Sequence, residues 1–138
     1  MSEQQVYRPG ESVEIEALPA EAGFWEIAEL PGIEPVAGVR MNMLAGARAM
    51  INWVRLEPGT TMPAHSHSHE QLGYVIEGTI IMRIGDETRE VGPGTCYVVP
   101  GGVEHEGVGG PNGCLVIDVF APPREDYLAA AKNSSVAE

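Results

Sequence analysis

The chain has 138 residues and a formal net charge of −12, and both limit its fold and its partners. A single domain of this length can bury enough apolar surface to fold without disulfide or metal support. The acidic balance argues against nucleic acid and anionic membranes as partners, because both require a basic face. The sequence contains no stretch of 18 apolar residues, so no membrane span is expected, and the first residues lack the features of a signal peptide. We therefore expect a cytoplasmic protein.

Residues 1–35 are acidic and repeatedly interrupted by proline, which predicts an irregular N-terminal arm. Within it, Val13–Leu18 alternates apolar and acidic residues, as an edge strand does. The stretch Phe24–Leu30 is apolar enough that we expect it to be buried. We expect the arm to pack on the rest of the domain or on a second subunit of a homodimer.

From Val39 onward, short apolar stretches alternate with glycine and proline, a pattern typical of a β-sandwich or β-barrel. The expected strands are Val39–Leu44, Ala49–Leu56, Leu72–Glu77, Thr79–Ile84, Thr88–Val91, Thr95–Val99, Glu104–Val108 and Cys114–Phe120. The expected dividers include Gly78 and Gly109–Gly113. Cys96 and Cys114 have no paired spacing, so we expect both to be reduced and buried.

After the last strand, the sequence predicts one short helix that ends near Lys132. Pro123 suits a first helical position, and acidic residues followed by an alanine run suit the turns after it. Residues 133–138 are expected to form a tail. The domain division is thus an arm over 1–35, a barrel over 36–127, and a helix end and tail over 128–138.

Histidine spacing predicts a metal site. His65 and His67 are separated by one residue, and side chains at i and i+2 of an extended strand point the same way. Gln71 and His105, from later strands, could complete four ligands around one divalent transition metal such as Zn, Ni, Fe or Mn. His69 is expected beside this set or facing solvent. The alternative is a histidine-rich surface loop, but the glycine frame around His105 favours the metal.

A glutamine in this ligand set has a chemical consequence. Three neutral imidazoles and a neutral amide leave the ion its full charge, which makes it a stronger Lewis acid. An anionic ligand would better stabilise the higher oxidation states of oxygen chemistry. Gln71 therefore favours isomerase or lyase chemistry over a dioxygenase.

Two glycine-framed motifs carry a family resemblance. Residues 59–78 read Gly59-x5-His65-x-His67-x3-Gln71-x6-Gly78, which resembles the first motif of the cupin family, with Gln where that motif usually has Glu. The second resembles Gly94-x5-Pro100-x-Gly102-x2-His105, with Gly109 where the motif ends in Asn. The resemblance covers roughly residues 36–127 of what would be a small single-domain bacterial cupin. It implies an all-β double-stranded β-helix, the jelly-roll barrel, with the metal inside and the short helix at the C-terminal end.

Asp118 stands in the apolar strand Cys114–Phe120, where alternation places it on the same face as Val116 and Phe120. A buried carboxylate costs several kcal/mol unless it is paired or hydrogen-bonded. Asp118 is therefore a candidate general acid or base, with a loop anchor as the alternative. Arg124 follows shortly after and could return across the barrel mouth, with a surface arginine as the alternative.

The stretch from Asp118 to Tyr127, together with the histidine segment, resembles the uronate-linearising cupins of pectin and alginate breakdown, the KdgF-like family. The resemblance implies metal ligands at His65, His67, Gln71 and His105, and pocket residues at Asp118, Phe120 and Arg124. It implies opening of a 4,5-unsaturated uronate to the linear 5-keto-4-deoxyuronate. Small cupins share these segments, so two alternatives stay open: a polyketide cyclase or other metal isomerase, and a non-catalytic binder of a sugar or acid.

Overall fold

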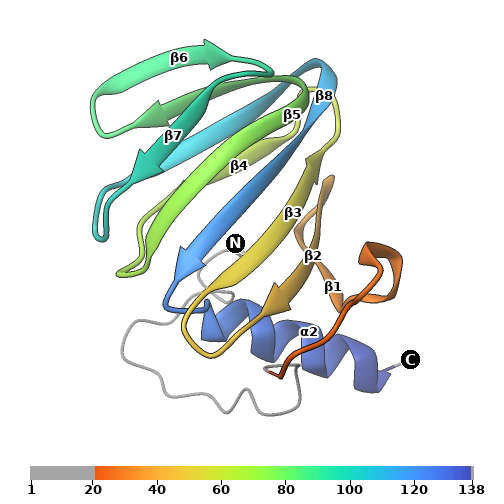
Figure 1. The fold of residues 1–138 in the computed structure, drawn as a ribbon. Coiled ribbons are helices and arrows are strands. Elements are labelled where there is room, and N and C mark those ends of the chain that lie inside the picture. Colours follow the sequence, from red (N-terminus) through yellow and green to blue (C-terminus); the bar gives the residue numbers. More distant parts are fainter. Residues whose placement is uncertain (1–20, 138) are drawn as a thin grey trace.

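The computed structural model describes residues 21–137, with side chains for residues 21–132. The expected edge strand Val13–Leu18 lies outside the described residues. Figure 1 shows two layers of antiparallel strands that curve around a common core, with one helix below them. The elements in order are the 3-10 helix η1 (Ile27–Glu29), β1 (Gly32–Val36), β2 (Val39–Ala45), β3 (Met50–Leu56), β4 (Thr61–His65), β5 (Glu70–Ile84), β6 (Glu87–Val91), β7 (Cys96–Val99), β8 (His105–Ala121) and helix α2 (Glu125–Ala137).

The strand order is β1-β2-β3-β8-β5-β6, with β4 paired to β8 and β7 paired to β5. Every pairing is antiparallel. The long strands β5 and β8 pair with each other and pass from one layer into the other, so they join the barrel. The predicted all-β jelly-roll barrel with a short C-terminal helix is confirmed.

Gly78 and Gly109–Gly113 do not divide strands, which corrects the sequence prediction. Gly78 and Gly113 both have positive φ, and the β5–β8 register shifts beside Gly78. A Cβ at Gly78 would collide with the carbonyl oxygen of Gly113. Only glycine accommodates this backbone approach, so these residues let two long strands bend where a turn was expected.

Two strands were not foreseen. Among the described strands, β1 contains Pro35 and pairs with β2 alone, an edge position where the missing N–H of proline is tolerated. β4 covers Thr61–His65, and its register with β8 places His65 opposite His105. Strand β4 therefore places His65 next to His105.

Three other expectations need correction. In the stretch Phe24–Leu30, only Leu30 is buried, while Phe24 is 102% exposed, Trp25 39% and Ile27 44%. Cys114 is buried as expected, but Cys96 is exposed, and both are free thiols. Helix α2 starts at Glu125 rather than at Pro123 and continues to Ala137, through most of the expected tail.

Neither helix in the described part of the chain has the length and apolarity needed to cross a membrane.

The core lies between the inner faces of the strands, where alternate residues of β2, β3 and β8 are buried. Side chains such as Met43, Val54 and Val116 fill it. Tyr127 and Leu128 of α2, both almost fully buried, belong to the same cluster, and the Tyr127 ring lies 6.0 Å from that of Phe120. The helix thus forms one wall of the interior in which the predicted site residues lie.

Candidate metal centre

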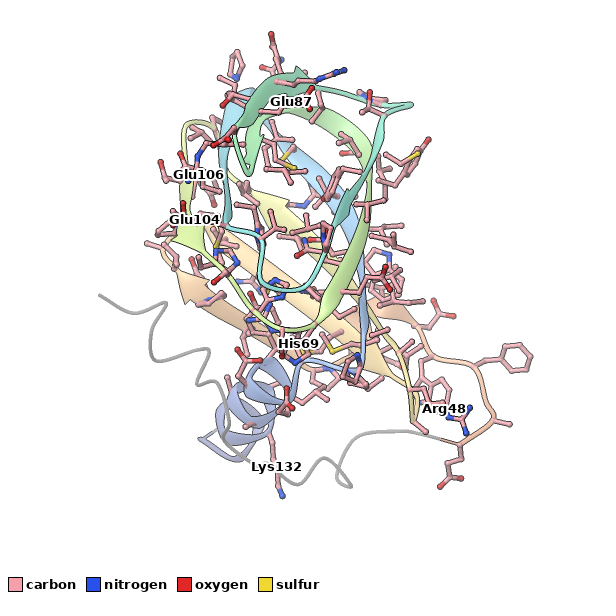
Figure 2. The ribbon with its side chains drawn as sticks, turned by 90° about the vertical axis from the view of Figure 1, so that its left-hand side faces the viewer. Arg48, His69, Glu87, Glu104, Glu106 and Lys132 are labelled. Atoms are coloured by element: carbon pink, nitrogen blue, oxygen red, sulfur yellow. The ribbon has the colours of Figure 1, made fainter. Side chains whose placement is uncertain are left out.

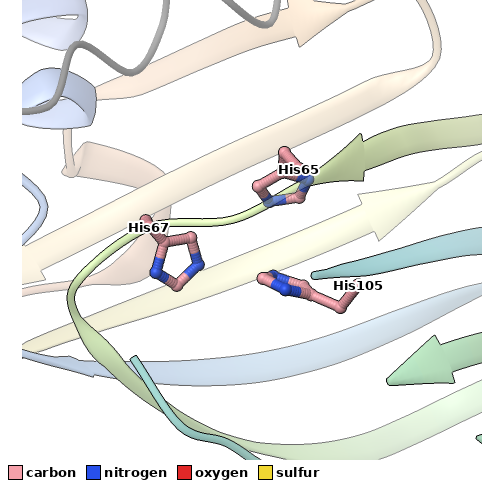
Figure 3. Close-up of side chains that lie close together, drawn as sticks. All are labelled: His65, His67 and His105. Carbon is pink, nitrogen blue, oxygen red and sulfur yellow. The ribbon is translucent and has the colours of Figure 1, made fainter. Parts of the chain in front are cut away.

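His65, His67 and His105 meet inside the barrel, as Figure 3 shows. One ring nitrogen from each lies within 4.8 Å of the others. The ring centroids of His65 and His105 are 4.3 Å apart, and those of His67 and His105 are 4.9 Å apart. His65 ends β4 and His105 begins β8, whereas His67 lies in the loop that follows β4. His65 and His67, which are two residues apart in the sequence, therefore reach the cluster from a strand end and from a loop, respectively.

Backbone carbonyls set the proton position on all three rings. Nδ1 of His65 lies 2.8 Å from the oxygen of Pro63, and Nδ1 of His105 lies 2.9 Å from that of Val103. Nδ1 of His67 lies 3.1 Å from the oxygen of His69. A carbonyl oxygen only accepts, so each Nδ1 carries the proton and each Nε2 keeps its lone pair. Nε2 of His105 is buried and has no hydrogen-bond partner among the described residues.

The rings are also poor bases. Burial lowers the pKa of His67 from 6.5 to about 3, and the nearby positive Arg124 adds to this effect. Burial likewise lowers the pKa of His105 to about 4, with His65 contributing. Neutral imidazoles with inward lone pairs are the form that binds metal ions.

Gln71, on the inner face of β5, adds an oxygen to the cluster. Its Oε1 lies 3.1 Å from Nε2 of His67, and its side chain also hydrogen-bonds Asp118. Within the Gln71 amide, only the NH2 can donate to the Asp118 carboxylate, so Oε1 is the atom that faces His67. Because Nδ1 of His67 holds the ring proton, two lone pairs face each other. A cation between them would satisfy both, so this donor set fits a divalent metal.

Asp118 lies on the inner face of β8 and is 7% exposed. The hydroxyl of Tyr97 donates to its Oδ1 over 2.7 Å. Burial raises the pKa of Asp118 from 3.8 to about 6, although the hydrogen bonds from Tyr97 and Gln71 and the charge of Arg124 act in the opposite direction. Burial also raises the pKa of Tyr97 well above its usual value, so Tyr97 remains a donor. Asp118 can thus hold or release a proton near neutral pH.

Phe120 and Arg124 line the same cavity. The Phe120 ring packs edge-on against His67 at 5.6 Å. Arg124 is only 1% exposed, so it is no surface arginine. Its guanidinium stacks 3.8 Å from the Tyr127 ring centroid and makes two hydrogen bonds to Asp126, of 3.0 and 2.8 Å. Asp126 was not among the predicted site residues.

His69 lies outside the three-histidine cluster, and it does not face solvent, because it is 2% exposed. Its Nε2 lies 2.6 Å from Oε1 of Glu125, in the first turn of α2. Its own carbonyl accepts the His67 Nδ1 proton. From the sequence alone, Glu125 is recognisable only as an acidic residue at a helix start. In the fold, it connects α2 to the loop that carries His67.

Gly73 explains how Tyr97 reaches Asp118. It lies between them in the sheet, paired with Tyr97 on β7 and with Asp118 on β8. Because Gly73 has no side chain, the Tyr97 ring lies across it, where an added Cβ would collide with that ring. Tyr97 could be found from the sequence only by knowing this register.

Gly73→Ala is expected to lower the free energy of unfolding by about 1–3 kcal/mol, the usual cost of overpacking. It should also weaken the Tyr97–Asp118 hydrogen bond. Gly46→Ala is the matched control, because its Cβ would meet only the Ala49 oxygen at an ordinary 3.6 Å. Urea unfolding of both variants checks this, and equal stability of the two would contradict the packing described here.

Comparison with known sequences and structures shows the family of this chain. The sequence matches the cupin domain family over residues 52–119. The pectin degradation protein KdgF of Dickeya dadantii is 30% identical over 102 residues, which cover 72% of this chain and 93% of the relative. The structure of KdgF from Halomonas sp. superposes with a TM-score of 0.71 at 28% identity, over 77% of this chain and 98% of that one. An RmlC-like cupin from Shewanella frigidimarina gives 0.71 at 27% identity, over 78% and 96%. The chain therefore belongs to the cupin family, as a small KdgF-like member.

Proposed function

We propose that this chain is a metal-dependent enzyme that opens the ring of 4,5-unsaturated uronates to linear 5-keto-4-deoxyuronate. One observation carries the proposal: Asp118, a buried carboxyl lining the cavity, is hydrogen-bonded to Gln71, whose oxygen faces the histidine cluster. Asp118, the proposed acid–base group, therefore lies next to the candidate metal centre. The KdgF relatives, one of them called a pectin degradation protein, support an acidic sugar as substrate.

The proposed reaction is an isomerisation, so no atom is gained or lost overall. The C1 hydroxyl loses its proton as the bond between C1 and the ring oxygen breaks, and the ring oxygen takes up a proton, which leaves an aldehyde at C1 and an enol at C5. The enol then becomes a ketone when C4 gains a proton and the C5 hydroxyl loses one. The chain must therefore supply a group that both takes and gives protons at the sugar.

Asp118 suits that role. Its Oδ1 accepts the Tyr97 hydroxyl proton over 2.7 Å, and the Gln71 amide also donates to the carboxyl. These bonds fix the side chain while it accepts a proton and returns it to carbon. A divalent metal held by His65, His67, Gln71 and His105 would supply Lewis acidity at a sugar oxygen.

Phe120 and Arg124 would orient the sugar. The Phe120 side chain gives the cavity an apolar wall beside His67. The Arg124 guanidinium is already stacked on Tyr127 and held by Asp126, so little side-chain freedom is lost when it meets a substrate carboxylate. We place the enzyme in the cytoplasm, acting on a small acidic sugar.

A second candidate is a polyketide cyclase or another metal isomerase with an apolar substrate. The observation that favours it is the cavity lining, which includes Met41, Val54, Met62, Ile80 and Met82. The two candidates differ in substrate charge. A non-catalytic cupin that only binds such a ligand would give no turnover on either.

The test is to incubate the metal-loaded protein with unsaturated galacturonate and unsaturated mannuronate and to follow loss of the conjugated absorbance. We expect a rate above the spontaneous one, with the linear keto acid as product by NMR. Loss of absorbance at the spontaneous rate on both sugars would contradict uronate linearisation. Turnover of an uncharged polyketide instead would support the second candidate.

Gln71→Glu is expected to keep the metal, or bind it more tightly, and to turn over more slowly. The added negative charge reduces the Lewis acidity of the ion. The change also removes the amide donor from Asp118 and sets a second carboxyl beside it. Metal content and kcat measured on the same samples check this. A loaded variant as fast as the parent would show that ligand charge does not control the rate.

The role of Arg124 is best tested in a background that spares the fold. Replacing Arg124 alone would leave Asp126, whose side chain is only 9% exposed, without its ion pair. We therefore compare Asp126→Asn with the double variant Arg124→Met/Asp126→Asn. The double variant should bind the uronate more weakly by about 1.5–3 kcal/mol, the value of a charge-assisted hydrogen bond, and the single variant should not. Calorimetric titration with an unreactive uronate measures this, and equal affinities would remove Arg124 from the carboxylate site.

A further inference from the structure

Asn52 is the polar exception on the inner face of β3. The other inward positions of this strand are Met50, Val54 and Leu56, which are apolar and buried. Asn52 is 0% exposed and lines the same cavity as Asp118. An amide in such a position loses its hydration, which costs free energy unless both of its ends are hydrogen-bonded. The role of Asn52 therefore depends on what each end of its amide contacts.

Only one end of the Asn52 amide has a partner in the described part of the chain. Its Nδ2 donates to the sulfur of Met41 on β2 over 3.3 Å. A thioether sulfur accepts hydrogen bonds only weakly and donates none, so the NH2 group is the end that faces Met41. Oδ1 is buried and accepts no hydrogen bond from any described residue. The barrel thus contains a buried acceptor that lacks a donor.

The neighbours of Asn52 do not supply that donor. Asn52 pairs with Asp118 on β8. The same row continues to Gly73 on β5 and Tyr97 on β7. The Tyr97 hydroxyl and the Gln71 amide both donate to Asp118, which as a carboxylate only accepts. Two acceptors therefore lie side by side on adjacent strands, with Cβ atoms about 4.5–5.5 Å apart, as in any directly opposed pair.

We propose that, in the proposed ring opening, Asn52 Oδ1 accepts a hydrogen bond from a hydroxyl of the substrate; this role rests on the proposed function. A sugar hydroxyl supplies the donor that both neighbouring acceptors lack. An apolar ligand would leave Oδ1 buried and unpaired, and a site built to bond a hydroxyl strongly disfavours an analogue without one. Asn52 therefore selects a hydroxylated sugar over an apolar substrate of similar size.

The position of Asn52 selects one hydroxyl of the sugar. Asn52 on β3 and Gln71 on β5 lie on opposite sides of Asp118, because β8 runs between their strands. The oxygen of Gln71 faces the histidine cluster, so the C1 hydroxyl and the ring oxygen, which react, belong on that side. The ring carbon opposite the ring oxygen is C3. It is also next to C4, the carbon that Asp118 would protonate. The C3 hydroxyl is therefore the one that reaches Asn52.

Flexible side chains give a ligand access to Asn52. Figure 2 looks into the barrel, where side chains of the surrounding strands fill the space between His69, near α2, and Glu87 on β6. Met62 and Met82 line the cavity together with Asn52. Methionine side chains are unbranched and adapt to new neighbours. They can shift to admit a sugar ring beside the amide.

The first test is the thermal stability of Asn52→Leu without sugar, because leucine has nearly the shape of asparagine and no polar atom. The variant loses a weak contact to Met41 and also a buried unpaired oxygen, so its midpoint should equal or exceed that of the parent. Asn42→Leu is the matched control on the outer side of β2. Its midpoint should fall, because Asn42 Nδ2 donates to the oxygen of Leu30 over 3.4 Å.

The second test is calorimetric titration of the metal-loaded chain with two unreactive ligands. One is the methyl glycoside of unsaturated galacturonate, whose ring cannot open because C1 carries no free hydroxyl. The other is the 3-deoxy analogue of this glycoside. We expect Asn52→Leu to bind the glycoside about tenfold more weakly than the parent does, the value of one hydrogen bond. It should bind the 3-deoxy analogue at least as tightly as the parent, and Asn42→Leu should match the parent on both.

Unchanged affinity of Asn52→Leu for the glycoside would overturn the proposal, and a fall in its stability would then make Asn52 a structural bracket for Met41. Equal weakening on both ligands would also overturn it, because the variant would have distorted the cavity. In either case, turnover of the uronate by the parent would leave the proposed function standing. A parent that neither binds the glycoside nor turns over the uronate would overturn both. If Asn52→Leu does not fold, Asn52→Val, whose β-branched side chain suits a strand, replaces it with the same expected results.

Discussion

Asp118→Asn is expected to reduce turnover by a factor on the order of 10²–10⁴, the usual contribution of general acid–base catalysis. Asparagine has nearly the same shape and still accepts the Tyr97 hydroxyl proton, but it cannot take or give the proton of the reaction. Fold and metal content should therefore be preserved. The measurement is kcat on metal-loaded samples whose folded fraction has been checked by thermal unfolding.

The control for this prediction is Tyr97→Phe, which removes one hydrogen bond from Asp118 and leaves the carboxyl in place. It should slow the reaction much less than Asp118→Asn does. If Asp118→Asn lowers thermal stability while the folded fraction keeps the parent rate, Asp118 is a structural anchor and the proposed acid–base role is wrong.

His105→Ala should abolish stoichiometric metal binding, whereas His69→Ala should keep most of it. Both side chains are buried histidines, so the pair is matched in size and chemistry. Nε2 of His105 points into the cluster without a hydrogen-bond partner, while Nε2 of His69 is directed to Glu125. Metal content by mass spectrometry, after dialysis against a defined ion, separates the two.

The carbonyl of His69 remains in the His69→Ala variant and can still accept the His67 Nδ1 proton. Loss of the Glu125 contact should loosen the loop, so we expect weaker retention under chelator challenge and not an empty site. A His69→Ala protein that binds no metal, beside a His105→Ala protein that does, would mean that the third imidazole was chosen wrongly.

The sequence predicts the barrel well because glycine and proline mark most strand ends. Its errors in dividing β5 and β8 have one physical cause, since positive-φ glycine serves both turns and bulges. Gly85 does divide two strands, but Gly78 bends one, and only the close carbonyl of Gly113 on the partner strand distinguishes the two uses. The exposure of Phe24 and Trp25 was missed for another reason, because apolar composition does not say whether a chain covers its own surface.

Only part of the candidate site, like only part of the fold, could be predicted from the sequence. Fixed spacing within two motifs identifies His65, His67, Gln71 and His105, because those residues lie at defined places on short segments. The supporting residues Tyr97, Glu125 and Asp126 have no such spacing. Tyr97 depends on the register around Gly73, and the two acids depend on where the first turn of α2 meets the barrel. Those relations arise only when distant segments pack.

The most direct test of the account is a titration of metal into stripped protein, with uronate ring opening and bound metal measured in the same samples. We expect no turnover above the spontaneous rate without metal, and a rate that rises linearly with added metal and levels off at one equivalent per chain. Full turnover by the stripped protein, or full metal binding without any turnover, would contradict it.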